Sequence, residues 1–236
     1  MSFFDPTVPI LRCKQEALDV QDLEGLLCID LRLGALSLFS SFYTRIDQVF
    51  VVWGWITLAI FSIAQFFPIS WQIQAIFWSV LTLVGCATTV WLTWFWVSVE
   101  RLRWVAYLWV GLMLLGVSVT DYGVFCGCGD ILLNLCPLWL GISAVGYAAT
   151  GLGMRSRTFL LASAIHVLGI MALPYFPGWQ FLATGSIMAG SLLLLAELQW
   201  DMRSPQAESS ALLSEEQRQF NRQQQELRMI ESPCQI

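Results

Sequence analysis

Long apolar runs dominate this chain, and short polar segments separate them. No Asp, Glu, Lys or Arg occurs between Asp47 and Glu100, and His166 is the only basic residue between Arg157 and Glu197. A helix needs about 20 apolar residues to cross about 30 Å of hydrocarbon, so each of these runs predicts two membrane spans joined by a turn. The runs are continuously apolar rather than alternating, which indicates helices and not the strands of a β-barrel.

This pattern predicts an all-α, polytopic membrane protein whose transmembrane domain covers residues 47–202. The six predicted spans are residues 49–67, 74–98, 104–121, 134–153, 158–176 and 179–200. Segments that begin at Pro68 and Pro174 mark two of the tight turns, because proline ends a helix at or just before itself.

The segment before the first span, residues 1–46, contains an apolar stretch that is too short to cross a membrane. Between Leu26 and Tyr43, about ten apolar residues are interrupted by Asp30 and Arg32, whereas a span needs about 20. The stretch predicts an amphipathic N-terminal helix that lies in the membrane interface. A helix packed on the ends of the bundle is the alternative.

The tail, residues 203–236, is polar and predicts a short soluble helix. Ser214-Glu-Glu-Gln217 fits a capping box at the start of that helix, after a linker that begins at Ser204-Pro205. Leu213, Phe220 and Leu227 recur every seven residues, a spacing suited to docking on a partner or on the N-terminal segment of the same chain. A solvated helix is the alternative interpretation.

The composition is typical of a membrane protein, and the positions of the basic residues predict which side of the membrane each terminus occupies. Of 236 residues, 57% are hydrophobic and 12% are charged, well below the quarter that is typical of soluble domains. All 12 Lys and Arg residues lie in the N-terminal segment, in the turns after the second and fourth spans, and in the tail. The positive-inside rule therefore predicts that both termini are cytoplasmic. The acidic, polar residues 1–30 do not resemble a cleavable signal peptide.

The 12 tryptophans are many for a chain of this length. Several of them, including Trp53, Trp78 and Trp139, fall near the ends of predicted spans. This placement is typical of the aromatic belts at the two membrane interfaces, and we expect those belts to account for most of the tryptophans.

Two stretches of the C-terminal half carry a resemblance to a known group of proteins. They are Gly151-Leu-Gly-Met-Arg-Ser-Arg157 and Leu193-Leu-Leu-Ala-Glu197-Leu-Gln-Trp-Asp-Met202. Together they resemble an uncharacterised family of six-span integral membrane proteins of cyanobacteria. The resemblance implies a bacterial plasma membrane or a thylakoid membrane, and it implies no activity.

The loop between the third and fourth spans holds the first group of candidate site residues. It carries Cys126, Cys128 and Cys136 together with Asp121 and Asp130, on the predicted non-cytoplasmic side, where disulfides persist. A structural disulfide from Cys136 to one of the other two, three unpaired thiols, and a redox-active or metal-binding set are all compatible with the spacing. Thiolates suit copper(I) or zinc, but no histidine is available on this side, and the identity of a metal stays unknown.

The second group lies inside the membrane. His166 is the only histidine and falls near the middle of the predicted fifth span, at a depth similar to that of Ser143 in the fourth. A structural hydrogen bond, a proton relay, and a single axial ligand to haem or chlorophyll are the alternatives for His166. The helix that separates the serine from the histidine in intramembrane serine proteases is missing, which disfavours a catalytic dyad. Glu100, Glu197 and Asp201 are interpreted as solvated charges at the membrane boundary.

No catalytic or transport motif stands out, so we expect a non-enzymatic integral membrane protein that acts through protein contacts. An assembly or scaffold subunit of a larger membrane complex is the favoured form of this prediction, with membrane lipids and a membrane protein as partners and no nucleic acid. A thiol-redox or metal-handling protein that uses Cys126, Cys128 and Cys136 is one alternative, and a small transporter or channel is another. The sequence requires no cofactor.

Overall fold

The structure is a computed structural model that describes residues 3–4, 9–33, 36–202 and 212–230. The linker predicted after the sixth span, from Ser204, lies outside these residues. Six helices of the described chain are long and apolar enough to cross a membrane, which confirms the predicted class of a polytopic, mainly helical membrane protein.

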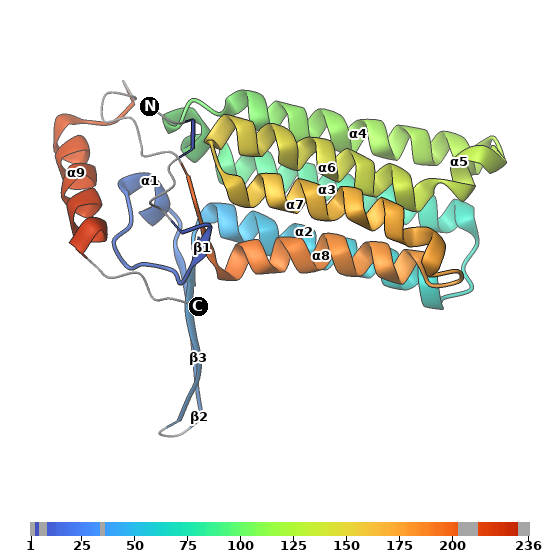
Figure 1. Ribbon diagram of the computed structural model, residues 1–236, viewed down its shortest axis with the longest axis horizontal. Coiled ribbons are helices and arrows are strands. Elements are labelled where there is room, and N and C mark those ends of the chain that lie inside the picture. The colour runs from blue at the N-terminus through green and yellow to red at the C-terminus, as the bar shows by residue number, and fades with distance from the viewer. Residues whose placement is uncertain (1–2, 5–8, 34–35, 203–211, 231–236) are drawn as a thin grey trace.

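The six long helices form a closed ring. They are α2 (Arg45–Phe66), α3 (Trp71–Val99), α4 (Arg103–Phe125), α6 (Leu135–Met154), α7 (Arg157–Ala172) and α8 (Gln180–Glu197). A 3₁₀ turn, η1 (Leu173–Tyr175), extends α7. Helices that follow one another along the chain pack side by side, and α8 packs extensively on α2, which closes the ring (Figure 1). The bundle therefore has an interior that all six helices share.

Local signals place the ends of these helices. Thr44 and Asp47 form a capping box at the start of α2, in which the Thr44 side chain accepts from the Asp47 amide and the Asp47 carboxylate accepts from the Thr44 amide. The turns after α3 and α6 share one geometry: Arg101 and Arg155 adopt positive φ values of 58° and 54°. The amide that follows each arginine then bonds back to a carbonyl five residues earlier, Leu102 to Val97 and Ser156 to Gly151, as in a Schellman motif.

The N-terminal segment and the tail meet at one end of the bundle, here called the capped end (Figure 1). Strand β1 (Leu11–Arg12) pairs antiparallel with β4 (Gln199–Trp200), which follows α8 directly. The short helix α1 (Val20–Leu23) packs against α3, and the tail helix α9 (Glu215–Ile230) packs against α1. The opposite end, here called the loop end, carries α5 (Gly129–Leu133) and the turn that begins at Pro68.

The expected amphipathic helix near residues 26–43 is wrong. The segment forms an antiparallel hairpin of β2 (Leu27–Leu33) and β3 (Leu36–Tyr43), with a bulge after Leu31. The reason is visible in the sequence, where leucine or isoleucine occupies every second position from Leu27 to Leu33, with Asp30 and Arg32 between them. This period of two suits a strand and not a helix. In Figure 1 this hairpin extends away from the capped end, roughly perpendicular to the helices.

Candidate functional site

The cysteines of the predicted outer loop lie at the loop end in different environments. Cys126 follows α4 and is exposed, Cys128 precedes α5 and is half-buried, and Cys136 lies in the first turn of α6 and is buried. All three are free thiols in the structure, so their disulfide, redox and metal-binding roles stay predictions.

The two acids of this loop also differ in their surroundings. The Asp121 carboxylate accepts hydrogen bonds of 2.9 and 3.1 Å from the Ser79 hydroxyl, and this contact joins α4 to α3. Asp130 is exposed in the first turn of α5. Across the described part of the chain, no group of three or more His, Cys, Asp or Glu residues has the geometry to hold a metal ion.

His166 is fully enclosed by the bundle, with none of its surface exposed. Its Nδ1 lies 2.8 Å from the carbonyl oxygen of Ala162, one turn earlier in α7. A carbonyl can only accept, so Nδ1 carries the proton, and in the neutral imidazole Nε2 is an acceptor with a free lone pair. That Nε2 atom has no hydrogen-bond partner. The imidazole packs against the Tyr147 ring, with the ring centroids 4.9 Å apart.

Ser143 does not form a dyad with His166, since no hydrogen bond joins these two described residues. Ser143 is buried, at 3% exposure, and lies in α6 beside the same cavity that His166 lines. The sequence thus placed both residues in one region of the bundle, and the structure adds the space between the helices.

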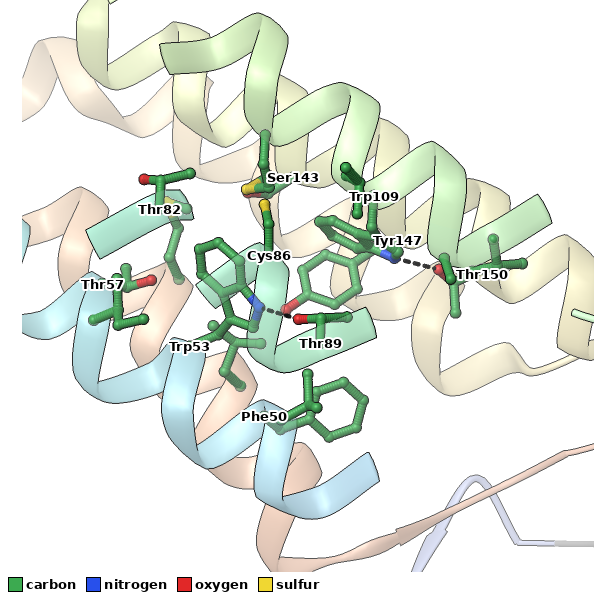
Figure 2. Close-up of a pocket in the computed structure, with 18 of the residues that line it drawn as sticks. Phe50, Trp53, Thr57, Thr82, Cys86, Thr89, Trp109, Ser143, Tyr147 and Thr150 are labelled. Carbon is green, nitrogen blue, oxygen red and sulfur yellow. Dashed lines mark hydrogen bonds between the residues drawn. The ribbon is translucent and has the colours of Figure 1, made fainter. Parts of the chain in front are cut away.

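This space is an apolar cavity of about 160 Å³ inside the ring. All six long helices contribute side chains to it, and no Asp, Glu, Lys or Arg residue is among them. Helix α3 presents one face along its length: Trp78, Thr82, Cys86, Thr89, Thr93 and Trp96. Figure 2 shows side chains from opposite helices, including Trp53, Cys86, Ser143 and Tyr147, converging on this region.

Three tryptophans that were expected at the membrane interfaces belong to this interior. Trp53, Trp78 and Trp139 all line the cavity, and Trp78 is only 5% exposed. The interfacial interpretation of these three is therefore wrong. Their indole N–H groups need partners once they are buried, and the bundle supplies hydroxyl groups for two of them.

Three of the interior tryptophans share one packing arrangement. Each indole N–H donates to a threonine hydroxyl, and that hydroxyl donates to the carbonyl of a glycine four residues earlier. The indole packs so closely on this glycine that a Cβ there would lie only 2.5–2.9 Å from the ring. The sets are Trp53 with Gly85 and Thr89, Trp109 with Gly146 and Thr150, and Trp139 with Gly116 and Thr120. The Gly-x-x-x-Thr spacing is the sequence signal that would have located them.

The tryptophan–threonine hydrogen bonds reduce the number of polar groups that the cavity can offer to a ligand. The hydroxyl groups of Thr89 and Thr150 are already occupied, because each accepts from a tryptophan and donates to a backbone carbonyl. Among the side chains that line the cavity, buried nitrogen atoms without a partner remain at two places: Nε2 of His166 and Nε1 of Trp78. The first accepts a hydrogen bond and the second donates one.

A haem or chlorophyll ligand at His166 does not fit this space. An apolar cavity of about 150 Å³ holds a ligand the size of benzene, and the cavity beside His166 has a volume of about 160 Å³. A tetrapyrrole macrocycle is several single rings wide, so it requires a different arrangement of the six helices.

A second cavity, of about 290 Å³, lies at the capped end, and charged and polar side chains line it together with apolar ones. Its walls come from the N-terminal segment, α3, the chain around β4, and α9. The Gln21 side chain donates to Glu100 at 3.0 Å and accepts from Asn221 at 3.0 Å, and Arg228 of α9 pairs with Asp19. These contacts dock the tail helix on the N-terminal segment. Glu100, interpreted from the sequence as a solvated charge, is only 3% exposed.

The carboxyl group of Asp22 has an unusual environment at this end. The surrounding protein desolvates it, and with the nearby Asp19 carboxylate this raises the pKa of Asp22 to about 7. The Trp96 indole opposes that shift by donating a hydrogen bond of 2.9 Å to Asp22 Oδ1. Burial likewise raises the pKa of Asp19, against the pull of Arg228.

Asp201 holds the other side of the capped end together. It accepts hydrogen bonds from the side chain of Ser156 and from both the backbone and side chains of Arg157 and Thr158, at 2.7–2.9 Å. Burial by itself raises the pKa of Asp201, but these hydrogen bonds outweigh it and leave the pKa below its ordinary value. The interpretation of Asp201 as a solvated boundary charge is wrong, because it is 4% exposed.

Comparisons with known proteins identify no relative. No protein-family model, no curated protein and no solved structure matches this chain. The structure supports one part of the resemblance to cyanobacterial membrane proteins, namely the six long apolar helices. It identifies no family.

Proposed function

We propose that this integral membrane protein is a non-enzymatic assembly or scaffold subunit of a larger membrane complex, and that the β2–β3 hairpin is the arm that contacts its protein partner. The observation that carries the proposal is the combination of a firmly held hairpin base with two strand edges that no other described strand covers.

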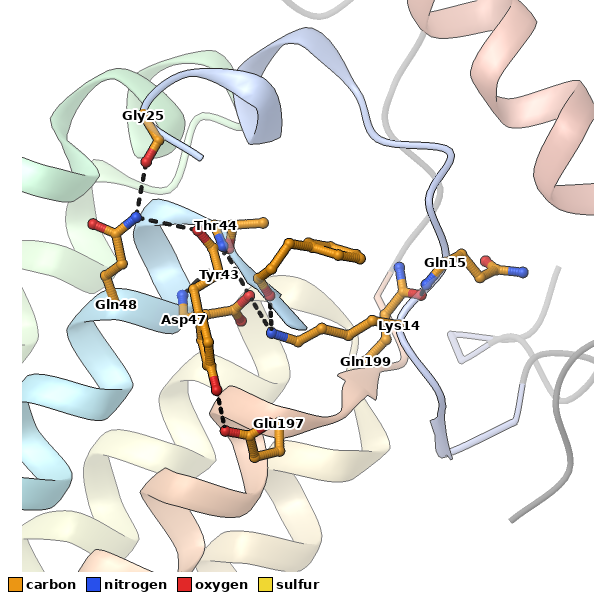
Figure 3. Close-up of polar contacts among 10 residues, drawn as sticks. Lys14, Gln15, Gly25, Tyr43, Thr44, Asp47, Gln48, Glu197 and Gln199 are labelled. Carbon is orange, nitrogen blue, oxygen red and sulfur yellow. Dashed lines mark hydrogen bonds and ion pairs between the residues drawn. The ribbon is translucent and has the colours of Figure 1, made fainter. Parts of the chain in front are cut away.

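The base of the hairpin is fixed by polar contacts with the bundle and the N-terminal segment (Figure 3). Lys14 Nζ donates to the Phe42 carbonyl at 2.7 Å and to the Asp47 carboxylate at 2.9 Å. The Tyr43 hydroxyl donates to Glu197 at 2.6 Å, and its burial together with this hydrogen bond raises the pKa of Tyr43 to about 12. An arm held at its base needs little ordering when it binds, which favours recognition.

The edges of the hairpin supply the means of contact. In a two-stranded sheet, each strand pairs on one side and presents unpaired backbone N–H and C=O groups on the other. A partner segment in extended conformation can add to such an edge as a further strand. The hairpin also extends away from the capped end, so a partner reaches it beside the bundle (Figure 1).

The proposal places the capped end in the cytoplasm, because every Lys and Arg belongs to the termini or to the two turns at that end. The membrane is then a bacterial plasma membrane or a thylakoid membrane, and the partner approaches from its cytoplasmic face. Membrane-impermeant maleimide tests this orientation: it should label Cys28 from the cytoplasmic side and Cys126 from the other. The reverse pattern would contradict the proposed orientation.

Two native cysteines allow a matched crosslinking experiment. Cys28 in β2 and Cys126 at the loop end are both exposed. Variants that keep one of the two, with the other cysteines replaced by Ser, are labelled with a thiol-reactive photocrosslinker in native membranes and irradiated. We expect a discrete protein adduct from the Cys28 variant and none of that mass from the Cys126 variant.

A hairpin deletion is the second arm of this test. Replacing residues 28–42 by a short Gly-Ser turn should abolish co-purification of the crosslinked protein, while circular dichroism should show that the helical bundle is retained. Crosslinks from Cys28 to lipid alone, or co-purification that survives the deletion, would refute the hairpin as a docking arm.

A further inference from the structure

The cavity inside the six-helix ring is independent of the proposed scaffold role. We propose that it is a binding site for a neutral, lipid-soluble molecule that carries a hydroxyl group on a single ring or a hydrocarbon chain. The free acceptor Nε2 of His166, in a cavity whose lining is mainly apolar and aromatic, is the group that recognises this hydroxyl.

The shape and lining of the cavity set the chemical class. Its lining extends along α3 from Trp78 to Trp96, roughly 27 Å at about 1.5 Å per residue, yet its volume is only about 160 Å³. A long, narrow space suits a slender hydrocarbon chain or one small ring. The absence of Asp, Glu, Lys and Arg from the described lining leaves an ion without a counter-charge, which excludes charged ligands.

The polar side chains of the cavity then determine which functional group the ligand must carry. The hydroxyl groups of Thr89 and Thr150 already accept hydrogen bonds from Trp53 and Trp109, so they have little capacity left to bond a ligand. His166 offers a lone pair, because its other ring nitrogen is committed to the Ala162 carbonyl. A ligand hydroxyl that donates to Nε2 satisfies a buried acceptor which is otherwise unpaired, whereas a hydrocarbon of equal shape does not.

Trp78 adds a second point of contact further toward the loop end. Its indole N–H is buried and has no partner, so it can donate to an ester, ether or carbonyl oxygen on an elongated ligand. Trp78 lies seven residues after the first residue of α3, whereas His166 lies near the middle of α7. The two groups therefore address different parts of a chain-like molecule.

A pair of isosteric probes tests the recognition by His166. We would measure the melting temperature of the full chain in lipid nanodiscs with increasing p-cresol or p-xylene, which differ by the replacement of a hydroxyl with a methyl group. A ligand that binds the folded state raises the melting temperature in a saturable way. We expect a saturable increase with p-cresol, and we expect the preference for p-cresol over p-xylene to fall about tenfold in His166→Phe.

Matched variants of α4 place the binding inside the cavity. Ala106 is buried and lines the cavity, whereas Gly111 on the same helix is exposed and a Cβ there would meet no atom within 4 Å. Ala106→Phe should abolish the p-cresol effect by filling the space, and Gly111→Phe should retain it. Comparing the two variants separates a specific site from partition of the probe into the membrane.

Cysteine protection gives a second readout that requires no change in the cavity. Cys86 lines the cavity, and Cys136 is buried outside its lining. In a variant that keeps only these two cysteines, p-cresol should slow the labelling of Cys86 by methyl methanethiosulfonate and leave Cys136 unchanged.

Three results would overturn the inference. The first is a p-cresol effect that never saturates, or none at all, as expected if the cavity holds only water beside His166. The second is an unchanged preference between the probes in His166→Phe. The third is a labelling rate of Cys86 that p-cresol does not alter.

Discussion

The indole Nε1 of Trp109 in α4 donates to the hydroxyl of Thr150 in α6 at 2.9 Å. Thr150 in turn donates to the Gly146 carbonyl at 2.8 Å, and a Cβ at Gly146 would lie 2.5 Å from the Trp109 ring. The Trp109 indole therefore bonds to Thr150 and packs against the bare backbone of Gly146, and the three residues together form one contact between α4 and α6. The same arrangement joins α2 to α3, and α6 back to α4.

Removing the hydroxyl at Thr150 should weaken the bundle. Thr150→Val keeps the shape of the side chain but leaves the buried Trp109 N–H without a partner, which costs about 1–3 kcal/mol of unfolding free energy. Unfolding in mixed detergent micelles measures the change. Thr150→Ser is the matched control, since it keeps the hydroxyl, and a loss as large in Ser as in Val would contradict the role of the hydrogen bond.

Adding a methyl group at Gly146 tests the close approach of the same pair. Gly146→Ala places a carbon against the Trp109 ring and forces the two helices apart, at a cost of about 1–3 kcal/mol. Gly190→Ala in α8, whose Cβ meets no atom within 4 Å, is the control and should keep the original stability. Equal stabilities of the two variants would show that the Trp109 ring can move aside.

Neutralising Asp201 should destabilise the capped end. Asp201→Asn removes the ion pair with the half-buried Arg157 and places an amide donor beside groups that already donate. Leaving those donors without the buried acceptor costs about 1–3 kcal/mol of unfolding free energy. The same unfolding assay measures this loss. Asp130→Asn changes an exposed acid at the loop end and should have no measurable effect. A stable Asp201→Asn variant would mean that its hydrogen bonds are replaced by water.

Docking of the N-terminal segment should weaken as the pH rises toward neutrality. The pKa of Asp22 is about 7 in the folded chain, against about 3.9 for an ordinary Asp, so the folded state binds more protons between these values and loses stability as the pH rises through them. The dependence levels off about one pH unit above the folded pKa, where Asp22 is ionised in both states. The charged groups near Asp22 are Asp19, Glu100 and Arg228, from α1 and its flank, α3 and α9.

Hydrogen-exchange protection factors for α1 measure this dependence. We expect stronger protection at pH 5.5 than at pH 8 in the natural chain, and a much flatter dependence in Asp22→Asn, which keeps an oxygen to accept from Trp96. Stronger protection at pH 8, or an unchanged dependence in the variant, would contradict the assignment to Asp22.

The membrane-spanning helices could be predicted from the sequence, but the contacts that the polar residues make could not. The charge-free run from Asp47 to Glu100 predicted two spans correctly, because the cost of exposing backbone groups to lipid leaves few alternatives. Asp201 looked like a solvated charge because the sequence does not show that Thr158 and Arg157 converge on it. The hairpin was missed for another reason: its alternating pattern was present but was interpreted as a short amphipathic helix.

Hydrophobic length and segregated charge are local properties, so the sequence was sufficient to predict six apolar helices and their approximate positions. It also placed His166 and Ser143 in the interior of the membrane domain. The packing of α8 on α2, which closes the ring, and the cavity in which His166 keeps a free lone pair became visible in the three-dimensional structure. Packing between helices that are far apart in the sequence depends on which of their faces meet, and a single sequence does not show which faces those are.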